Sequence, residues 1–244
     1  MEKERQDVPT CLLPRDHAMD ASMATCSTLP QPRIKPTHWR QGSILWLASA
    51  LLLLVCVSAV LAEAANVFLG RNFRTVVPGQ CYRSAQPNAL MLAEVKEAHG
   101  ILSILNLRDE NEDESWYQEE VQAAKKLGIK LVNVGLSSRA QPPEHDFVRF
   151  VDGMDACPQP MLIHCASGND RTGLASAVYM LLYTNVTPAE ARGQLTMRYG
   201  HIPWGKAACL QRILDNYETW LCETNQTHSP DNFRLWARTA YRPE

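Results

Sequence analysis

The chain lacks several features that mark broad classes of protein. Its 24 lysines and arginines are offset by 26 aspartates and glutamates, and no basic stripe runs along it. The charge neutralisation that nucleic-acid binding needs is therefore missing, and no nucleic-acid partner is expected. No internal repeat is visible, which argues against a repeat architecture. The histidines stand apart without partner ligands at metal spacing, so neither a metal nor another cofactor is expected: His145, His164, His201 and His228.

Charge is absent altogether from residues 44–62, 19 residues in a row. A bilayer-spanning helix needs roughly 20 apolar residues, so we predict a transmembrane anchor or uncleaved signal here. A cleavable signal peptide is the alternative, because Ala62-Glu63-Ala64 resembles a small-x-small cleavage site. Residues 1–43 contain five prolines and little apolar periodicity, which predicts a disordered tail.

The flanks of this apolar segment predict its orientation. Arg33, Lys35 and Arg40 precede it without an acidic residue between positions 21 and 43, whereas Glu63 follows it directly. The positive-inside bias places the N-terminus in the cytoplasm. The remainder of the chain is then extracytoplasmic, or periplasmic if the source is bacterial.

The segment His164–Gly173, HCASGNDRTG, carries the chemistry. It follows an apolar run typical of a buried strand and leads into an apolar helix. Gly168 permits the tight curvature with which the amides of residues 166–170 (Ala166, Ser167, Gly168, Asn169, Asp170) can converge on an anion. Arg171 offers a planar fork that matches two phosphoryl oxygens. Cys165 is the candidate nucleophile, because the positive field of the loop amides and of the helix end stabilises its thiolate. Thr172 can donate a hydrogen bond to its sulfur.

This segment resembles the HCxxGxxR-[ST]-G signature of the cysteine-dependent phosphatases, most closely the dual-specificity branch. Tyr82–Pro87 (YRSAQP) and Asn106-Leu107-Arg108 resemble landmarks of membrane-anchored or exported bacterial members, so the resemblance covers roughly residues 76–185. It implies a two-step hydrolysis through a phosphocysteine, with Cys165 as nucleophile, Arg171 as phosphate clamp and His164 fixing the loop. Arg83 and Arg108 either add positive potential or support the sheet ends.

The general acid is missing from its usual place. Dual-specificity phosphatases carry an aspartate on a loop upstream of the cysteine, but residues 132–140 contain no carboxylate. Asp170 is one substitute, since it gives the loop the DRT form of myotubularin-type phosphatases. Glu144 and Asp146 are the others, although acids in the first turn of a helix also suit its dipole.

The remaining pattern alternates strands and helices, which predicts an α/β domain over residues 70–244 with a mostly parallel central sheet flanked by helices. Residues 80–84 are expected to be an edge strand, and Thr187 to cap a helix that ends near Gly200. The other expected strands cover residues 101–107, 129–134 and 160–164, and the other expected helices cover residues 89–99, 116–127, 144–155 and 207–220.

Three functions remain open: an active phosphatase, a phosphate-binding pseudophosphatase that acts as a binding module, and another enzyme with the same loop, such as an arsenate reductase or sulfur transferase. The substrate is either phosphotyrosine or another phosphoprotein, or a phosphoinositide or inositol phosphate. No lysine stands in the loop to meet extra phosphates. Four further cysteines form either two disulfides or four buried thiols: Cys81, Cys157, Cys209 and Cys222.

Overall fold

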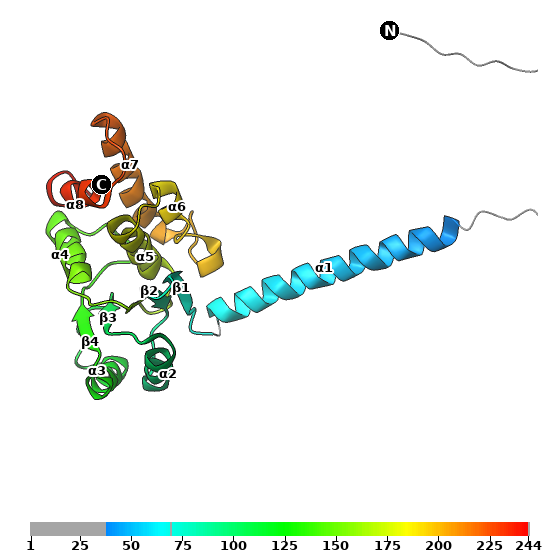
Figure 1. Cartoon of the computed structure of the whole chain (residues 1–244), viewed down its shortest axis with the longest axis horizontal. Helices are drawn as coiled ribbons and strands as arrows, with labels where there is room; N and C mark the ends of the chain where they lie inside the picture. Colours follow the sequence, from blue (N-terminus) through cyan, green and yellow to red (C-terminus); the bar gives the residue numbers. More distant parts are fainter. Residues whose placement is uncertain (1–37, 69, 244) are drawn as a thin grey trace, which may run out of the picture. The chain divides into compact units, whose positions relative to one another are not determined.

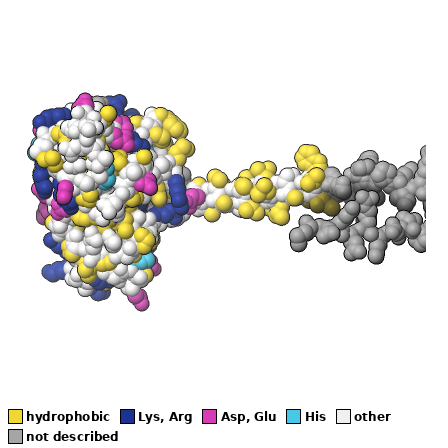
Figure 2. All heavy atoms as spheres, turned by 45° about the horizontal axis from the view of Figure 1, so that its top comes forward, with side chains coloured by type: hydrophobic (Ala, Val, Ile, Leu, Met, Phe, Trp, Pro, Cys, Tyr) yellow, Lys and Arg dark blue, Asp and Glu magenta, His cyan; other side chains and the backbone are white. Residues whose placement is uncertain are grey.

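A computed structural model describes residues 38–68 and 70–243 (Figure 1). Its first element is the long helix α1 (His38–Phe68), in which Ser43–Val67 is long and apolar enough to cross a membrane. Figure 2 shows apolar side chains exposed along the visible face of this helix. The predicted span 44–62 lies wholly within it. The predicted tail lies outside the described residues up to position 37, and residues 38–43 begin α1.

The folded domain is built on a five-stranded sheet in the order β1-β2-β5-β3-β4. Only β1 (Arg74–Val77) runs antiparallel to its neighbour; β2 (Cys81–Ser84), β3 (Ser103–Asn106), β4 (Lys130–Asn133) and β5 (Met161–His164) are parallel. The expectation of a mostly parallel sheet flanked by helices is confirmed.

Helices cover both faces of the sheet (Figure 1). One apolar core forms under α2 (Ala89–His99) and α3 (Ser115–Leu127). The larger core lies under α4 (Glu144–Asp155), α5 (Asp170–Tyr183), α7 (Gln211–Glu223) and α8 (Pro230–Thr239). Ten of the fourteen residues of α5 are buried, as expected for a helix that is apolar nearly all round.

Two predictions about these elements were wrong. The strand at residues 80–84 is not an edge strand, because β2 lies between β1 and β5 and all four of its residues are buried. Arg83 can be buried in this central strand because its partners, the carbonyls of Gly168 and Gln194, come from elsewhere in the chain. The helix that Thr187 caps, α6 (Pro188–Arg192), ends before Gly193 rather than near Gly200, in keeping with the poor helix propensity of glycine.

Other boundaries were close. The Thr187–Glu190 capping box is present, with the Glu190 amide donating to Thr187 Oγ1 over 3.3 Å. Short 3-10 helices occupy Met197–Tyr199 and Lys206–Leu210, the latter leading into α7. The strand β1 and the helix α8 were not predicted.

The register of the parallel strands locates the functional edge. Ser84 and Asn106 both pair with His164, and Asn106 also pairs with Asn133. The four parallel strands therefore end at the same level, and the chain leaves β5 directly into Cys165. The carboxyl edge of a parallel sheet is where such folds place ligands.

Candidate active site

The phosphate loop, residues 165–170, curves between the end of β5 and the start of α5. Cys165 is almost completely buried, with 2% of its surface exposed. Gly168 has φ +75°, and a Cβ there would lie 2.7 Å from the Ala85 nitrogen and 2.8 Å from the Ser84 carbonyl. Only glycine fits this turn, because both the backbone angle and the neighbouring strand exclude a side chain.

Arg83 supports the loop from beneath. This fully buried guanidinium donates to the carbonyl of Gly168 over 2.8 Å and to that of Gln194 over 2.9 Å. The Cζ atom of Arg83 lies 4.2 Å from the centre of the Tyr199 ring. Burial lowers the pKa of Arg83 to about 10. Both roles left open for Arg83 find support: its hydrogen bonds hold the loop at the end of the sheet, and its charge acts on Cys165.

Asn72 supports the loop from a second side. It is fully buried, and its Nδ2 lies 3.3 Å from the Gly168 carbonyl and 3.0 Å from that of Tyr199. In a trans peptide the carbonyl and the next N–H point in opposite directions. Because Arg83 and Asn72 both donate to the Gly168 carbonyl, the Asn169 N–H of the same peptide points away from these two side chains.

Arg171 lies on the first turn of α5 and reaches back across the sheet edge. Its guanidinium donates to the carbonyls of Leu107 and Leu136 over 3.2 and 3.4 Å. Its Nε is buried without a protein partner in the described residues. This leaves a donor for an anion held in the loop.

Arg108 is the second cation at this edge. It donates to Gln86 Oε1 over 2.9 Å, and its carbon lies 3.4 Å above the Trp116 ring. The pKa of Arg108 is lowered, first by burial and then by the charge of Arg171, and its interaction with Cys165 offsets part of this lowering. Arg108 therefore adds positive potential close to the thiol, in a field that favours an anion.

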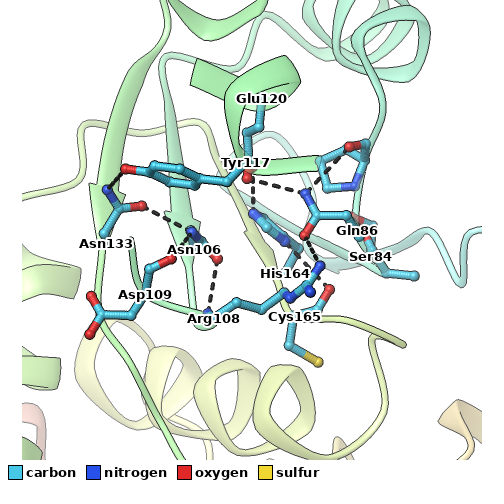
Figure 3. Close-up of polar contacts among 12 residues, drawn as sticks. Ser84, Gln86, Asn106, Arg108, Asp109, Tyr117, Glu120, Asn133, His164 and Cys165 are labelled. Atoms are coloured by element: carbon cyan, nitrogen blue, oxygen red, sulfur yellow. Dashed lines mark hydrogen bonds and ion pairs between the residues drawn. The ribbon is translucent and has the colours of Figure 1, made fainter. Parts of the chain in front are cut away.

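A series of buried polar contacts links Arg108 to His164, the last residue of β5 (Figure 3). Gln86 also donates to Glu120 Oε2 over 3.1 Å, and Glu120 Oε1 lies 2.6 Å from His164 Nε2. Glu120 and His164 are both fully buried. The pair holds the imidazole immediately before Cys165, which is the placement expected of His164.

Glu120 was not identified from the sequence, although a signal exists. It shares the buried face of α3 with Tyr117, Ala123 and Ala124. A glutamate on the apolar face of an amphipathic helix is rarely buried without a partner.

Asp170, the first residue of α5, lies beside a second residue that the sequence did not reveal. Its Oδ1 lies 2.7 Å from Nδ1 of the fully buried His201. Asp170 also lines a cleft together with Ser138, Arg139 and Lys206. Residues 132–140, which lack the usual aspartate, thus contribute Arg139 to the cleft that Asp170 also lines.

Glu144 and Asp146 occupy the first turn of α4, where the dipole favours them. Glu144 pairs with Arg242 over 3.3 Å and lines a cleft formed with α8 and the C-terminal residues. Asp146 pairs with the neighbouring His145 over 3.4 Å. Neither lines the cleft beside Asp170.

No group of three or more metal-binding side chains occurs in residues 38–68 and 70–243. The remaining cysteines Cys81, Cys157, Cys209 and Cys222 are free thiols. Of the two alternatives, disulfides are therefore not formed, but only Cys81 and Cys157 are buried, while Cys222 is exposed. Burial raises the pKa of Cys157 to about 11 and that of Cys81 well above its ordinary value.

Comparisons with known proteins agree with this geometry. A model of the "tyrosine phosphatase family" matches residues 68–190, just over half of the chain. Inositol diphosphatase SIW14 of Saccharomyces cerevisiae is 36% identical over 107 residues, which are 42% of this chain and 36% of that protein. The chain therefore matches little more than a third of the length of this curated relative.

Solved structures of phosphatases also match the chain. The core catalytic domain of the PP-IP phosphatase SIW14 from S. cerevisiae, in complex with citrate, has a TM-score of 0.48 and 27% identity over 63% of this chain and 93% of that one. TpbA of P. aeruginosa in complex with pTyr has a TM-score of 0.47 and 16% identity over 70% of this chain and 92% of that one.

Proposed function

Because the chain belongs to the tyrosine phosphatase family and is a cysteine-dependent phosphatase, we propose that Cys165 carries its reaction. The Cys165 thiolate attacks the phosphorus of a phosphate monoester, and the bond to the ester oxygen breaks. The leaving oxygen takes up a proton. Water then attacks the phosphocysteine, which releases inorganic phosphate and restores the thiolate.

The observation that carries this proposal is a pair of unpaired donors in the two residues that follow the loop. Arg171 Nε and Thr172 Oγ1 are both buried and have no protein partner in the described residues. Buried polar groups are normally paired, so these two await a ligand. Arg171 binds two phosphoryl oxygens, the loop amides of residues 166–170 bind the others, and Thr172 donates to the departing sulfur in the second step.

Asp170 is the acid that we assign to the leaving oxygen, or to the attacking water in the second step. Its side chain is 27% exposed at the edge of the loop and lies beside His201. Among the described residues, it is the one carboxylate that lines the cleft next to the loop. A positioned acid of this kind contributes roughly a hundredfold or more to ester cleavage.

The substrate is a phosphorylated protein, an inositol phosphate or a phospholipid. The name of the relative from S. cerevisiae supports a phosphorylated inositol, whereas the absence of lysine from residues 166–170 suits a monophosphate with a single charged group. The exposed apolar helix α1 supports a single-pass membrane protein. With its N-terminus in the cytoplasm, the catalytic domain is extracytoplasmic.

Phosphate release by the full chain in detergent and reductant tests the proposal, with Cys165→Ser as the blank. Substrates are an aryl phosphate, phosphotyrosine and phosphoserine peptides, and short-chain phosphoinositides. We expect release that Cys165→Ser abolishes and that Arg171→Lys reduces at least about a hundredfold, since a point charge cannot reproduce the guanidinium fork. A folded, reduced wild-type protein that releases nothing above the blank would favour a phosphate-binding pseudophosphatase.

A further inference from the structure

The phosphate loop is tied to the end of the apolar helix by a very short stretch of chain. Val67 ends the apolar part of α1, and Asn72, only five residues later, hydrogen bonds to the carbonyls of Ser167, Gly168 and Tyr199. Five residues span at most about 18 Å. If α1 leaves a bilayer at Val67, the loop therefore lies within roughly that distance of the point of exit.

Ion pairs join the end of α1 to the start of β1 and to the segment around Arg198. Glu63 is the first charged residue after the uncharged run of residues 44–62. Its carboxylate lies 2.6 Å from Arg74 and 3.3 Å from Arg198. Val60, Val67 and Met197 line an apolar hollow beside this pair.

The segment around Arg198 has the composition of a membrane interface. In residues 197–206, which we name the interfacial segment, Met197 is 63% exposed, Ile202 50% and Trp204 75%. The same ten residues include Arg198 and Lys206. Tryptophan and basic residues beside exposed apolar side chains are typical of the headgroup level of a bilayer, because exposure of the apolar side chains to water is unfavourable.

The interfacial segment also adjoins the active site. Ile202 and Lys206 line the cleft that contains Asp170, and the Tyr199 carbonyl shares Asn72 with the phosphate loop. A ligand in the loop is thus flanked by an apolar side chain and a cation, which suit the glycerol and headgroup ends of a phospholipid.

We propose that the interfacial segment rests in the headgroup layer of the bilayer that holds α1, and that the phosphate loop hydrolyses a phosphate monoester carried by a lipid of that bilayer. This inference rests on the proposed phosphatase function and narrows its substrate class. A phosphoprotein in solution is the competing substrate. It is less favoured because the loop is held close to the membrane and the exposed apolar side chains lie beside it.

Full chain reconstituted in phosphatidylcholine vesicles that contain phosphatidic acid tests the proposal. The Met197→Ser/Trp204→Ser double variant removes the apolar contacts without altering the loop or its cleft. Leu235→Ser is the matched control, because Leu235 is an exposed apolar residue on α8. We expect the double variant to lower phosphatidic acid turnover about tenfold and to leave turnover of a soluble aryl phosphate unchanged, while Leu235→Ser changes neither.

Equal phosphatidic acid turnover by the wild type and the double variant would overturn the inference, and so would hydrolysis of a phosphotyrosine peptide without hydrolysis of the lipid. If the proposed phosphatase function itself is wrong, the result is different: the wild type then hydrolyses the aryl phosphate no faster than Cys165→Ser does.

A binding measurement keeps the inference testable without catalysis or the double variant. Brominated phosphatidylcholine should quench part of the tryptophan emission of the full chain, and that part should decrease in Trp204→Ser. Unchanged quenching in that variant would refute the interfacial contact.

Discussion

Replacing Arg83 and Arg108 separately should distinguish support of the phosphate loop from attraction of the substrate. Both arginines lie near the loop, but Arg83 is fully buried and bonded to main-chain carbonyls. Arg108 lies on the Trp116 ring and donates a hydrogen bond to the Gln86 side chain. We therefore expect Arg83→Met to change stability and Arg108→Met to change catalysis.

The magnitude for Arg83 follows from two opposing effects. Its guanidinium makes three close hydrogen bonds, to the Gly168 carbonyl and to the main-chain and side-chain carbonyls of Gln194, each worth about 2 kcal/mol with a charged donor. Its pKa of about 10 means that keeping the guanidinium charged inside the fold costs about 3 kcal/mol, a cost that is absent for the uncharged methionine. Arg83→Met should therefore lower the free energy of unfolding by about 3 kcal/mol, or the melting temperature by roughly 10 °C.

Thermal unfolding of the full chain in detergent measures the first effect, and kcat/KM on an aryl phosphate measures the second. Arg108→Met should cost less than about 1 kcal/mol in stability, because its contacts are partly exposed, and about tenfold in kcat/KM through the lost positive potential. The reasoning would be refuted if Arg83→Met stayed within about 1 kcal/mol of the wild type, or if Arg108→Met destabilised the protein equally.

Two further predictions concern protons. His201→Leu removes the imidazole beside Asp170 and should lower kcat for alkyl phosphates about tenfold more than for aryl phosphates. Asp170→Asn should have the same effect, whereas His201→Asn keeps a polar group beside Asp170 and should retain the rate. Equal slowing of both esters by His201→Leu or Asp170→Asn would instead indicate a structural role. Because burial raises the pKa of Cys81 and Cys157 in the fold, the unfolded chain loses these protons first as pH rises from about 9 to 10, so the free energy of unfolding should fall by about 1.4 kcal/mol per pH unit and thiol. Urea unfolding across this range should show a shallower decline for Cys157→Ala, and an unchanged slope would contradict the assignment; above about pH 10 the lowered pKa of Arg83 acts in the opposite direction.

What the sequence determined lies within short stretches of chain. The order of His164, Cys165, Gly168 and Arg171 predicts a strand, a tight anion-binding loop and a helix, because the periodicity and the turn chemistry behind this prediction are local. Helix α4 and the Thr187 capping box were predictable for the same reason, since periodicity and capping are local.

Only the tertiary structure decided which distant residues complete the site. Glu120 reaches His164 from α3, Asn72 reaches Gly168 from the chain before β1, and His201 reaches Asp170 from beyond α6. These partners meet because the register of β2, β5 and β3 aligns their carboxyl ends. The burial of Arg83 was likewise not visible in the sequence, because the carbonyls that pair with it lie far along the chain. A buried polar side chain requires a partner, but its sequence position alone does not show which one it finds.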